Sequence, residues 1–279
     1  MSSKKEDTGV YYIDCMQCQS CFNHIGIKRY ADLIDMKEYW DHDYVKGGRM
    51  MHTLHMAALV NLSCHSYHNE SFYVWPTVID LSVPDKSASS VEKRNVAKNI
   101  LGISKPENVI PAGLDLVAVC YKEIHFMAIT FGRAPPRLKK NTNKDWLLSI
   151  YDSLLSSSKN YYEEFEAFFE KFSIDPSSVE IILEDCVKQK DATSCGFHAY
   201  YNFFNVLCNN QDDCIEAKML MKSVKGDKDA VMRQFTVENY RKLIQYHAGD
   251  LIQFGNKIKE ETNSMNVDTW LVMMLVVMK

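Results

Sequence analysis

The feature that most constrains this chain is a cysteine at the start of an apolar run with helical periodicity. Cys195 is followed by Gly196 and by mostly apolar residues through Leu207, and Ala199 and Phe203 fall on the same helical face as Cys195. A thiol at a helix N-terminus faces unpaired backbone N–H groups and the positive end of the helix dipole, which favour its ionisation. The pattern therefore predicts a reactive cysteine, whereas Cys-Gly taken alone is more typical of a buried structural cysteine.

A glutamine six residues before the cysteine adds a hydrogen-bond donor to the same region. Gln189 lies in a polar segment, and Thr193 and Ser194 are suitable N-caps for the expected helix. The side-chain amide of Gln189 and the backbone N–H of Cys195 can converge on an oxygen that becomes negative during attack. We interpret this segment as an oxyanion hole.

Two expected strands upstream of the cysteine carry a histidine and an aspartate that can complete a catalytic triad. Residues 114–121 and 125–131 have the composition of two strands joined by a short turn, and His125 opens the second. A third expected strand, 146–153, carries Asp152 near its end. A histidine that activates a thiol needs a carboxylate or amide to fix its tautomer. Singly, a strand histidine is usually packed and an aspartate before serine usually caps a turn.

These motifs, taken in chain order, resemble those of the ubiquitin-like-protein-specific proteases, the SUMO-protease family of cysteine peptidases. The shared order is histidine with an aromatic residue, then Tyr-Asp-Ser, then a glutamine six residues before Cys-Gly. By position, the resemblance implies His125 as general base and Asp152 as its orienting acid. It implies Gln189 as the oxyanion donor and Cys195 as the nucleophile.

The resemblance also carries expectations about fold and partners. It implies an α+β, papain-like cysteine protease fold, in which helices flank a central mixed β-sheet and the nucleophile sits at a helix N-terminus. The expected partner is a ubiquitin-like modifier, SUMO or Nedd-class, together with its conjugates. The expected reaction is cleavage after the modifier's C-terminal glycines, in precursor processing or deconjugation, with no cofactor or metal.

Several features of the sequence depart from the family pattern. Phe126 stands where the family usually has a tryptophan, and Ser194 stands where it often has an aspartate. The basic, proline-bearing segment 132–144 is longer than the family's usual hairpin, and we expect a mobile surface loop there. The family's substrate-contacting tryptophan corresponds loosely to Trp40. The resemblance therefore implies Trp40 and Phe126 as the residues that flank the glycine tail.

Two other classes of function fit the same residues. Bacterial effector acetyltransferases have a similar constellation, in which the cysteine accepts an acetyl group and passes it to a protein side chain. A non-catalytic module that binds a ubiquitin-like protein is the other alternative.

Composition excludes several further classes. The 279 residues carry a formal net charge of -4, which argues against a nucleic-acid-binding protein. The polar residues 1–9 lack the apolar core of a signal peptide. We therefore expect a nuclear or cytoplasmic protein whose nine cysteines are thiols.

The chain divides into an N-terminal cysteine-rich extension (1–29), a protease domain (30–250) and a C-terminal extension (251–279). The apolar run 270–278 within the last part is too short to span a bilayer and is expected to dock as a helix or strand.

The N-terminal extension contains four residues of metal-binding type, Cys15, Cys18, Cys21 and His24. Thiolates and imidazoles are the usual ligands of zinc, but most zinc sites separate two ligand pairs by a longer loop. Both a zinc site and a flexible thiol-rich extension remain open, and we expect the latter.

The remaining segments outline an α+β domain. His52 and His55 share a helical face without a nearby carboxylate, so we expect packed or solvated histidines. Periodicity predicts further helices and one further strand. The expected helices are 56–62, 91–101, 161–172 and 229–246, and the expected strand is 179–187.

Overall fold

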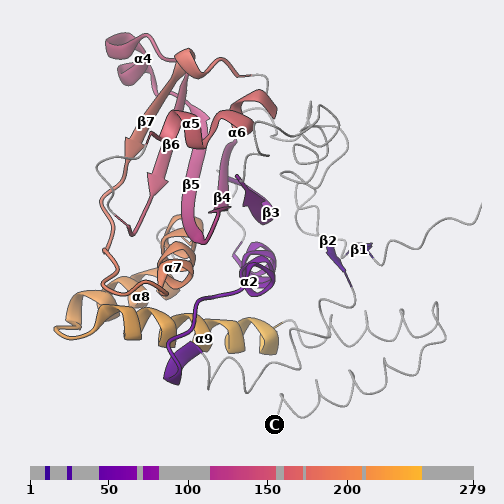
Figure 1. Cartoon of the computed structure of the whole chain (residues 1–279), viewed down its shortest axis with the longest axis vertical. Coiled ribbons are helices and arrows are strands. Elements are labelled where there is room, and N and C mark those ends of the chain that lie inside the picture. Colours follow the sequence, from indigo (N-terminus) through magenta and orange to yellow (C-terminus); the bar gives the residue numbers. More distant parts are fainter. Residues whose placement is uncertain are drawn as a thin grey trace, which may run out of the picture.

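The structure, a computed structural model, describes residues 10–12, 24–26, 44–67, 72–81, 114–154, 160–171, 174–208 and 212–246. Its centre is a five-stranded sheet in the order β3-β4-β5-β6-β7, with helices on both faces (Figure 1). The strands are β3 (Phe72–Asp80), β4 (Asp115–Lys122), β5 (His125–Arg133), β6 (Trp146–Tyr151) and β7 (Val179–Leu183). The short strands β1 (Val10–Tyr12) and β2 (His24–Gly26) pair with each other in a separate antiparallel sheet.

The five-stranded sheet is mixed. β4, β5 and β6 are antiparallel neighbours, whereas β3 runs parallel to β4 and β7 runs parallel to β6. The central strands are buried on both faces, which explains their nearly continuous apolar sequences. The predicted central mixed sheet flanked by helices is confirmed.

Helices of different character cover the two faces. They are α2 (Thr53–Ser66), α4 (Pro136–Thr142), α5 (Tyr161–Glu164), α6 (Glu166–Lys171), α7 (Cys195–Leu207), α8 (Asp212–Ser223) and α9 (Lys228–Tyr246). A 3₁₀ turn, η2 (Pro176–Ser178), precedes β7.

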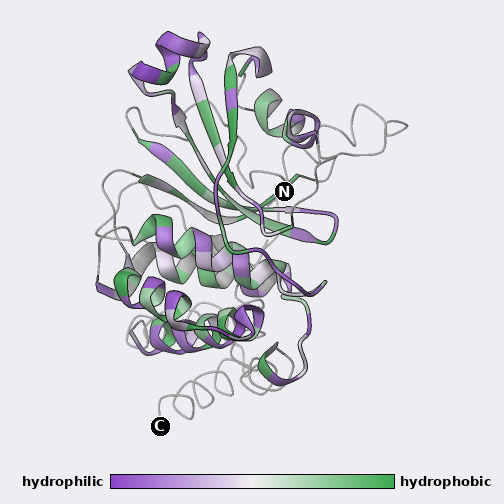
Figure 2. Ribbon diagram, turned by 90° about the vertical axis from the view of Figure 1, so that its left-hand side faces the viewer, coloured by the Kyte–Doolittle hydropathy of each residue, from purple (hydrophilic) through white to green (hydrophobic). Residues whose placement is uncertain are grey.

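Two apolar cores result from the alternation of side chains along the strands. Val117 and Val119 of β4 point to the face covered by α2, α7 and α9, whereas Leu116 and Ala118 point to the face covered by α5 and α6. α7 lies directly on β4 and β5 and is buried around almost its whole circumference. Figure 2 shows helices stacked in layers against one face of the sheet. The helix that begins with Cys195 is therefore held between the sheet and the helices α2, α8 and α9.

β3 was not expected from the sequence. Its segment contains Pro76, and the pairing with β4 shifts register between Val74 and Val78. A proline cannot donate to a ladder, so it is confined to edge strands and bulges, and β3 is an edge strand with an irregularity at that point. Pro76 thus interrupts the sequence pattern of β3, and pairing with β4 stabilises the strand.

Other expectations need correction in detail. The segment 132–144 is not a loop throughout, because β5 continues to Arg133 and Pro136 opens the helix α4. The expected single helix 161–172 is divided at Phe165 into α5 and α6. The expected strand 179–187 ends at Leu183.

The remaining expectations are confirmed or lie outside the described residues. The expected helices 56–62 and 229–246 are present as parts of α2 and α9. Most of the extensions 1–29 and 251–279 and the expected helix 91–101 lie outside the described residues. Within the described ranges, no helix combines the length and apolarity needed to cross a bilayer.

Candidate active site

The hairpin β4–β5 and the end of β6 bring His125 and Asp152 together. His125 opens β5 and pairs with Lys122 across a two-residue turn. Ala128 of β5 pairs with Tyr151, so the residue after β6, Asp152, lies near the start of β5. His125 Nε2 lies 2.7 Å from Asp152 Oδ1, and both side chains are buried.

The carboxylate of Asp152 is fixed by further donors. Tyr161 Oη donates to Asp152 Oδ2 at 2.8 Å, and the backbone N–H of Leu154 donates to Oδ1 at 2.8 Å. Because an ionised carboxylate only accepts hydrogen bonds, His125 Nε2 carries a proton. The other ring nitrogen, Nδ1, is buried and has no hydrogen-bond partner within the described part of the chain. It is the nitrogen left to act on a thiol.

The surroundings of His125 favour its protonated form. Burial lowers the pKa of the imidazole, but the hydrogen bond to Asp152, the nearby Cys195 thiol and the charges of both groups raise the pKa to about 9. Cys195 is therefore close enough to His125 to stabilise the imidazolium. A histidine with this pKa is charged at neutral pH, as a thiolate–imidazolium pair requires.

Cys195 is the first residue of α7, as the sequence predicts. Its backbone N–H belongs to the first turn, whose N–H groups have no partner within the helix. The sulfur donates weakly to the carbonyl of Ile124, at 3.8 Å, in the turn before His125. Only 1% of Cys195 is exposed, so the thiol is closed to a large substrate in this conformation.

Close packing explains the glycine after the cysteine. A Cβ atom on Gly196 would lie 2.8 Å from Met51 Cβ and 3.3 Å from Phe126 Cδ2. A side chain at position 196 would therefore collide with Met51, and glycine lets α7 pack closely against this residue. Phe126 itself is buried against Tyr121, with ring centroids 4.7 Å apart, and its role beside a glycine tail stays a prediction.

Gln189 links the end of β6 to the segment before α7. Its Oε1 accepts from Ser153 Oγ at 2.6 Å, and its Nε2 donates to the carbonyl of Asp191 at 2.8 Å. A primary amide nitrogen has two N–H groups, so these contacts use one of them. These contacts hold Gln189 beside Ser153, the residue after Asp152, and its role as an oxyanion donor stays a prediction.

Two polar pairs that no sequence pattern indicates hold the same segment, and the first joins a buried arginine to a partly exposed aspartate. Arg233 of α9 donates to Asp191 Oδ2 at 3.0 Å and to Thr193 Oγ1 at 2.7 Å. Asp191 Oδ1 in turn accepts the backbone N–H groups of Thr193 and Ser194. Burial raises the pKa of Asp191, but these hydrogen bonds outweigh it and lower the pKa to about 2.

The second pair joins α7 to α9. His198 Nε2 lies 2.8 Å from Asp229 Oδ1, and Asp229 Oδ2 accepts the backbone N–H groups of Lys190 and Asp191. His198 Nδ1 contacts the carbonyl of Val187 at 3.0 Å. A histidine in an apolar run and an aspartate near a helix start are common, so only the structure shows that they meet.

Other residues of chemical interest fall outside this site. Trp40, Cys15, Cys18 and Cys21 lie outside the described residues, and so does the side chain of His24. Among described residues, no group of three or more His, Cys, Asp or Glu side chains could hold a metal ion. His55 is packed, as expected, with its ring against Tyr44. Burial, aided by His52, lowers the pKa of His55 to about 3.

The cysteines whose side chains are described are all free thiols. They are Cys120, Cys186, Cys195, Cys208 and Cys214.

Comparison with known proteins gives distant structural similarity only. No family model matches the chain, and no curated protein matches it. A crystal structure of "the de-sumoylating protease" has 12% identity and a TM-score of 0.42, covering 97% of this chain and 92% of that one. SUMO protease Ulp1, with its catalytic cysteine oxidised to a sulfenic acid, has 13% identity and a TM-score of 0.40, covering 76% and 93%.

Proposed function

We propose that this protein is a cysteine protease of papain-like architecture that cleaves after the C-terminal glycines of a ubiquitin-like modifier. The observation that carries the proposal is the buried contact of 2.7 Å between His125 Nε2 and Asp152 Oδ1, beside the cysteine that begins α7. The choice of a ubiquitin-like modifier rests on the order and spacing of the sequence motifs.

In the proposed reaction, the thiolate of Cys195 attacks the carbonyl carbon of the terminal glycine. The backbone N–H of Cys195 and the amide of Gln189 stabilise the oxyanion. The imidazolium of His125 then protonates the departing amine, and the C–N bond breaks to leave a thioester. A water molecule, deprotonated by His125, then attacks the thioester carbonyl; the C–S bond breaks, the modifier leaves with a free C-terminal carboxyl group, and the thiolate and imidazolium are restored.

Asp152 acts on this reaction through His125. Its carboxylate holds the proton on Nε2 and directs Nδ1 toward the sulfur. Tyr161 and the N–H of Leu154 fix the carboxylate in turn. Trp40 and Phe126 are the proposed contacts of the glycine tail, where residues without side chains can thread.

The burial of Cys195 supports a second candidate, a non-catalytic module that binds a ubiquitin-like protein. With 1% of the residue exposed, cleavage requires the chain around the sulfur to open. A binding module requires no such opening. The two candidates therefore differ in whether the thiol becomes accessible when the modifier binds.

Electrophilic modifier probes test the proposal directly. SUMO, a Nedd-class modifier and ubiquitin, each with a C-terminal vinyl methyl ester, would be incubated with the full chain and analysed by intact mass. We expect one probe to form a covalent adduct at Cys195, and Cys195→Ala to bind that probe without an adduct. The matched control is Cys186→Ser, a half-buried thiol that should leave capture intact.

Each outcome decides between the candidates. Binding of a modifier without capture would establish the binding module. A labelled acetyl group transferred from acetyl-coenzyme A to Cys195 would replace protease by acetyltransferase. Neither binding nor capture of any modifier would overturn the modifier assignment.

A further inference from the structure

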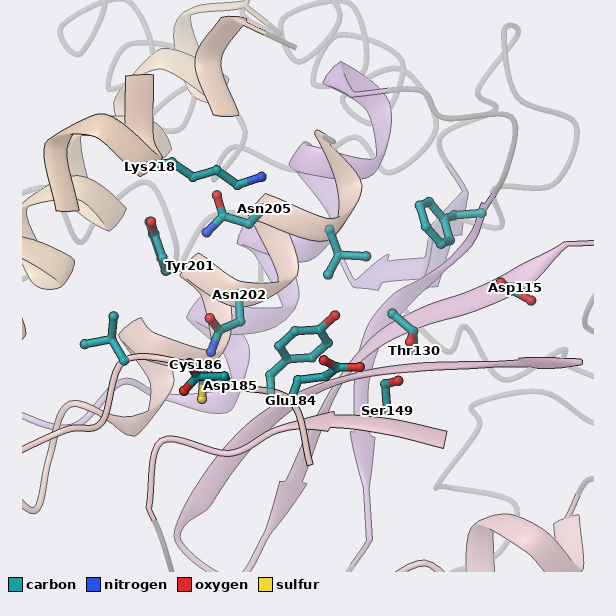
Figure 3. Close-up of a pocket in the computed structure, with 14 residues that line it drawn as sticks. Asp115, Thr130, Ser149, Glu184, Asp185, Cys186, Tyr201, Asn202, Asn205 and Lys218 are labelled. Carbon is teal, nitrogen blue, oxygen red and sulfur yellow. The ribbon is translucent and has the colours of Figure 1, made fainter. Parts of the chain in front are cut away.

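A hollow lies between the sheet and the helices α7 and α8, and it is lined by residues that the proposed reaction does not use (Figure 3). Its volume is about 780 Å³. The floor comes from β5 and β6, one wall from α7 with Lys218 of α8, and the other wall from residues 184–187 after β7. We call it the α7–β7 groove.

The floor is hollow because small polar side chains replace apolar ones. Thr130 of β5 and Ser149 of β6 pair directly across the sheet and line the groove. In the same row of the sheet, Thr130 pairs on its other side with Val117, which packs in the core. Small hydroxyl side chains leave the space above them unfilled and offer donors and acceptors in it.

The wall formed by α7 presents an amide that lacks a partner. Asn202 is 7% exposed and lines the groove, and its Nδ2 has no hydrogen-bond partner within the described residues. A buried donor without an acceptor destabilises the fold, and few such groups occur in native proteins. A carbonyl oxygen placed in the groove would satisfy it.

The groove lies apart from the thiol but shares a segment with the candidate active site. Asn202 follows Cys195 by two turns of α7, about 10 Å along the helix axis. The wall residue Cys186 donates to the carbonyl of Asp152 at 3.3 Å. The groove is therefore a separate site that touches the candidate active site through residues 184–187.

The rim carries an excess of negative charge. Among the residues that line the groove, Asp115, Glu184 and Asp185 are acidic and Lys218 is basic. Burial, followed by the charges of Glu184 and Cys186, raises the pKa of Tyr151 to about 12, so its hydroxyl stays protonated. This charge favours a cationic occupant and disfavours the phosphates of a nucleic acid.

We propose that the α7–β7 groove binds an extended peptide segment of a protein partner that carries basic side chains. A backbone carbonyl of the peptide accepts from Asn202 Nδ2, and its basic groups face Glu184 and Asp185. The aliphatic part of a lysine or arginine side chain lies against Val187 and Val206. The proposal does not depend on catalysis by Cys195.

Fluorescence anisotropy with the full chain tests the proposal. The protein carries Cys195→Ala, which prevents turnover, and the probe is a fluorescein-labelled peptide of alternating glycine and lysine. We expect saturable binding of this peptide and none of the same peptide with glutamate in place of lysine. Spermine, a cation without a peptide backbone, should compete weakly.

Charge changes on the rim locate the binding. Asp185→Lys should raise the Kd about fivefold, and Lys218→Glu should lower it by a similar factor, because exposed charge pairs have effects of this size. The matched control is Glu216→Lys on α8, an exposed residue outside the groove, which should change the Kd by less than about twofold. Asn202→Ala should also weaken binding, with its thermal melt as the check on folding.

Several results would overturn the assignment. One is the absence of saturable binding, and another is equal binding of the glutamate peptide. Equal effects of Asp185→Lys and Glu216→Lys would place the peptide elsewhere. Complete displacement by spermine at the peptide's own concentration would make the groove a simple cation site. Because binding is measured without turnover, none of these results bears on the proposed protease function.

Discussion

His198 on α7 and Asp229 on α9 form a buried pair whose Nε2 and Oδ1 atoms lie 2.8 Å apart. The other oxygen of Asp229 accepts the backbone N–H groups of Lys190 and Asp191. The pair therefore ties the segment between Gln189 and Cys195 to α9, the helix that also holds this segment through Arg233. Its proposed role is to position the oxyanion donor and the nucleophile.

Asp229→Asn should lower the rate of covalent capture at Cys195 by about tenfold, because the amide cannot accept from His198 and from two backbone groups together. The apparent affinity for the probe should change little. Unfolding in urea should show a loss of about 2–3 kcal/mol, because buried hydrogen-bonding groups lose an acceptor.

The control for this substitution is Asp227→Ala. Asp227 accepts the N–H groups of Asp229 and Ala230 at the start of α9, so its loss should cost about 1 kcal/mol of helix capping. Capture should stay near the wild-type rate. Equal losses of capture rate in both variants would show that Asp229 stabilises the fold and does not position the candidate site.

Tyr161→Phe removes the donor to Asp152 Oδ2 and leaves that oxygen without this bond. We expect a fall of about tenfold in the capture rate, since a carboxylate that is less firmly held orients His125 less well. Cleavage at a fixed pH, measured beside the thermal melt, checks this. Tyr162→Phe, a neighbouring substitution that removes a bond to the carbonyl of Val179, is the control and should retain the rate.

The pH dependence follows from the raised pKa of His125. The imidazolium that stabilises the thiolate is present below a pKa of about 9, so capture should decline as the pH rises through about 9. The stability that this pairing contributes has the same sign: it is complete below pH 6.5 and is lost as the pH rises through about 9. Asp152→Asn removes one cause of the raised pKa.

Rates of probe capture between neutral and alkaline pH check this prediction. The falling limb of the Asp152→Asn variant should lie at lower pH than that of the wild type. A limb at the same pH in both proteins would mean that another group controls the reaction.

Acid stability should depend on Asp191. Its pKa is lowered from 3.8 to about 2, so it stabilises the fold above pH 3.8, and this contribution is lost as the pH falls through about 2. Because the carboxylate is 40% exposed, solvent screening reduces the effect to about 1 kcal/mol. Unfolding free energies at neutral and acid pH should show a smaller acid loss in Asp191→Asn than in the wild type.

Gly196→Ala tests the close contact beside the nucleophile. The added methyl group would meet Met51 Cβ at 2.8 Å, and overpacking of this kind costs about 1–3 kcal/mol. The matched control is Gly226→Ala, where no atom lies within 4 Å of the added Cβ, and its stability should change by less than about 0.5 kcal/mol. Equal melting temperatures for the two variants would contradict the packing argument.

The parts of this structure that local patterns determine were predictable. β4, β5 and β6 have the alternation or apolar content of strands, and the run after Cys195 has helical periodicity, so these elements lie where the sequence indicates. β3 was missed because Pro76 breaks its pattern, and only pairing with β4 makes it a strand. The helix α4 was also missed, because its residues are mostly polar and basic and show no apolar face. Pro136 at its start is the one local signal for a helix there.

The site was predictable only as far as its motifs reach. The residues expected to act together, His125 and Asp152, do meet, because antiparallel pairing of β5 with β6 places them at the same end of the sheet. Tyr161, Asp229 and Arg233 were not expected, because each acts through tertiary contacts with residues that are distant in sequence. No local pattern marks a tyrosine or an arginine that will donate to a carboxylate far away in the sequence.

The bond between Arg233 and Asp191 spans 42 positions of the chain. During synthesis, the ribosome therefore releases Cys195 well before the helix that organises its loop. Until α9 is synthesised, the nascent polypeptide contains Cys195 but lacks the bond from Arg233 that holds the preceding segment. The candidate site is therefore complete only when α9 has emerged and docked.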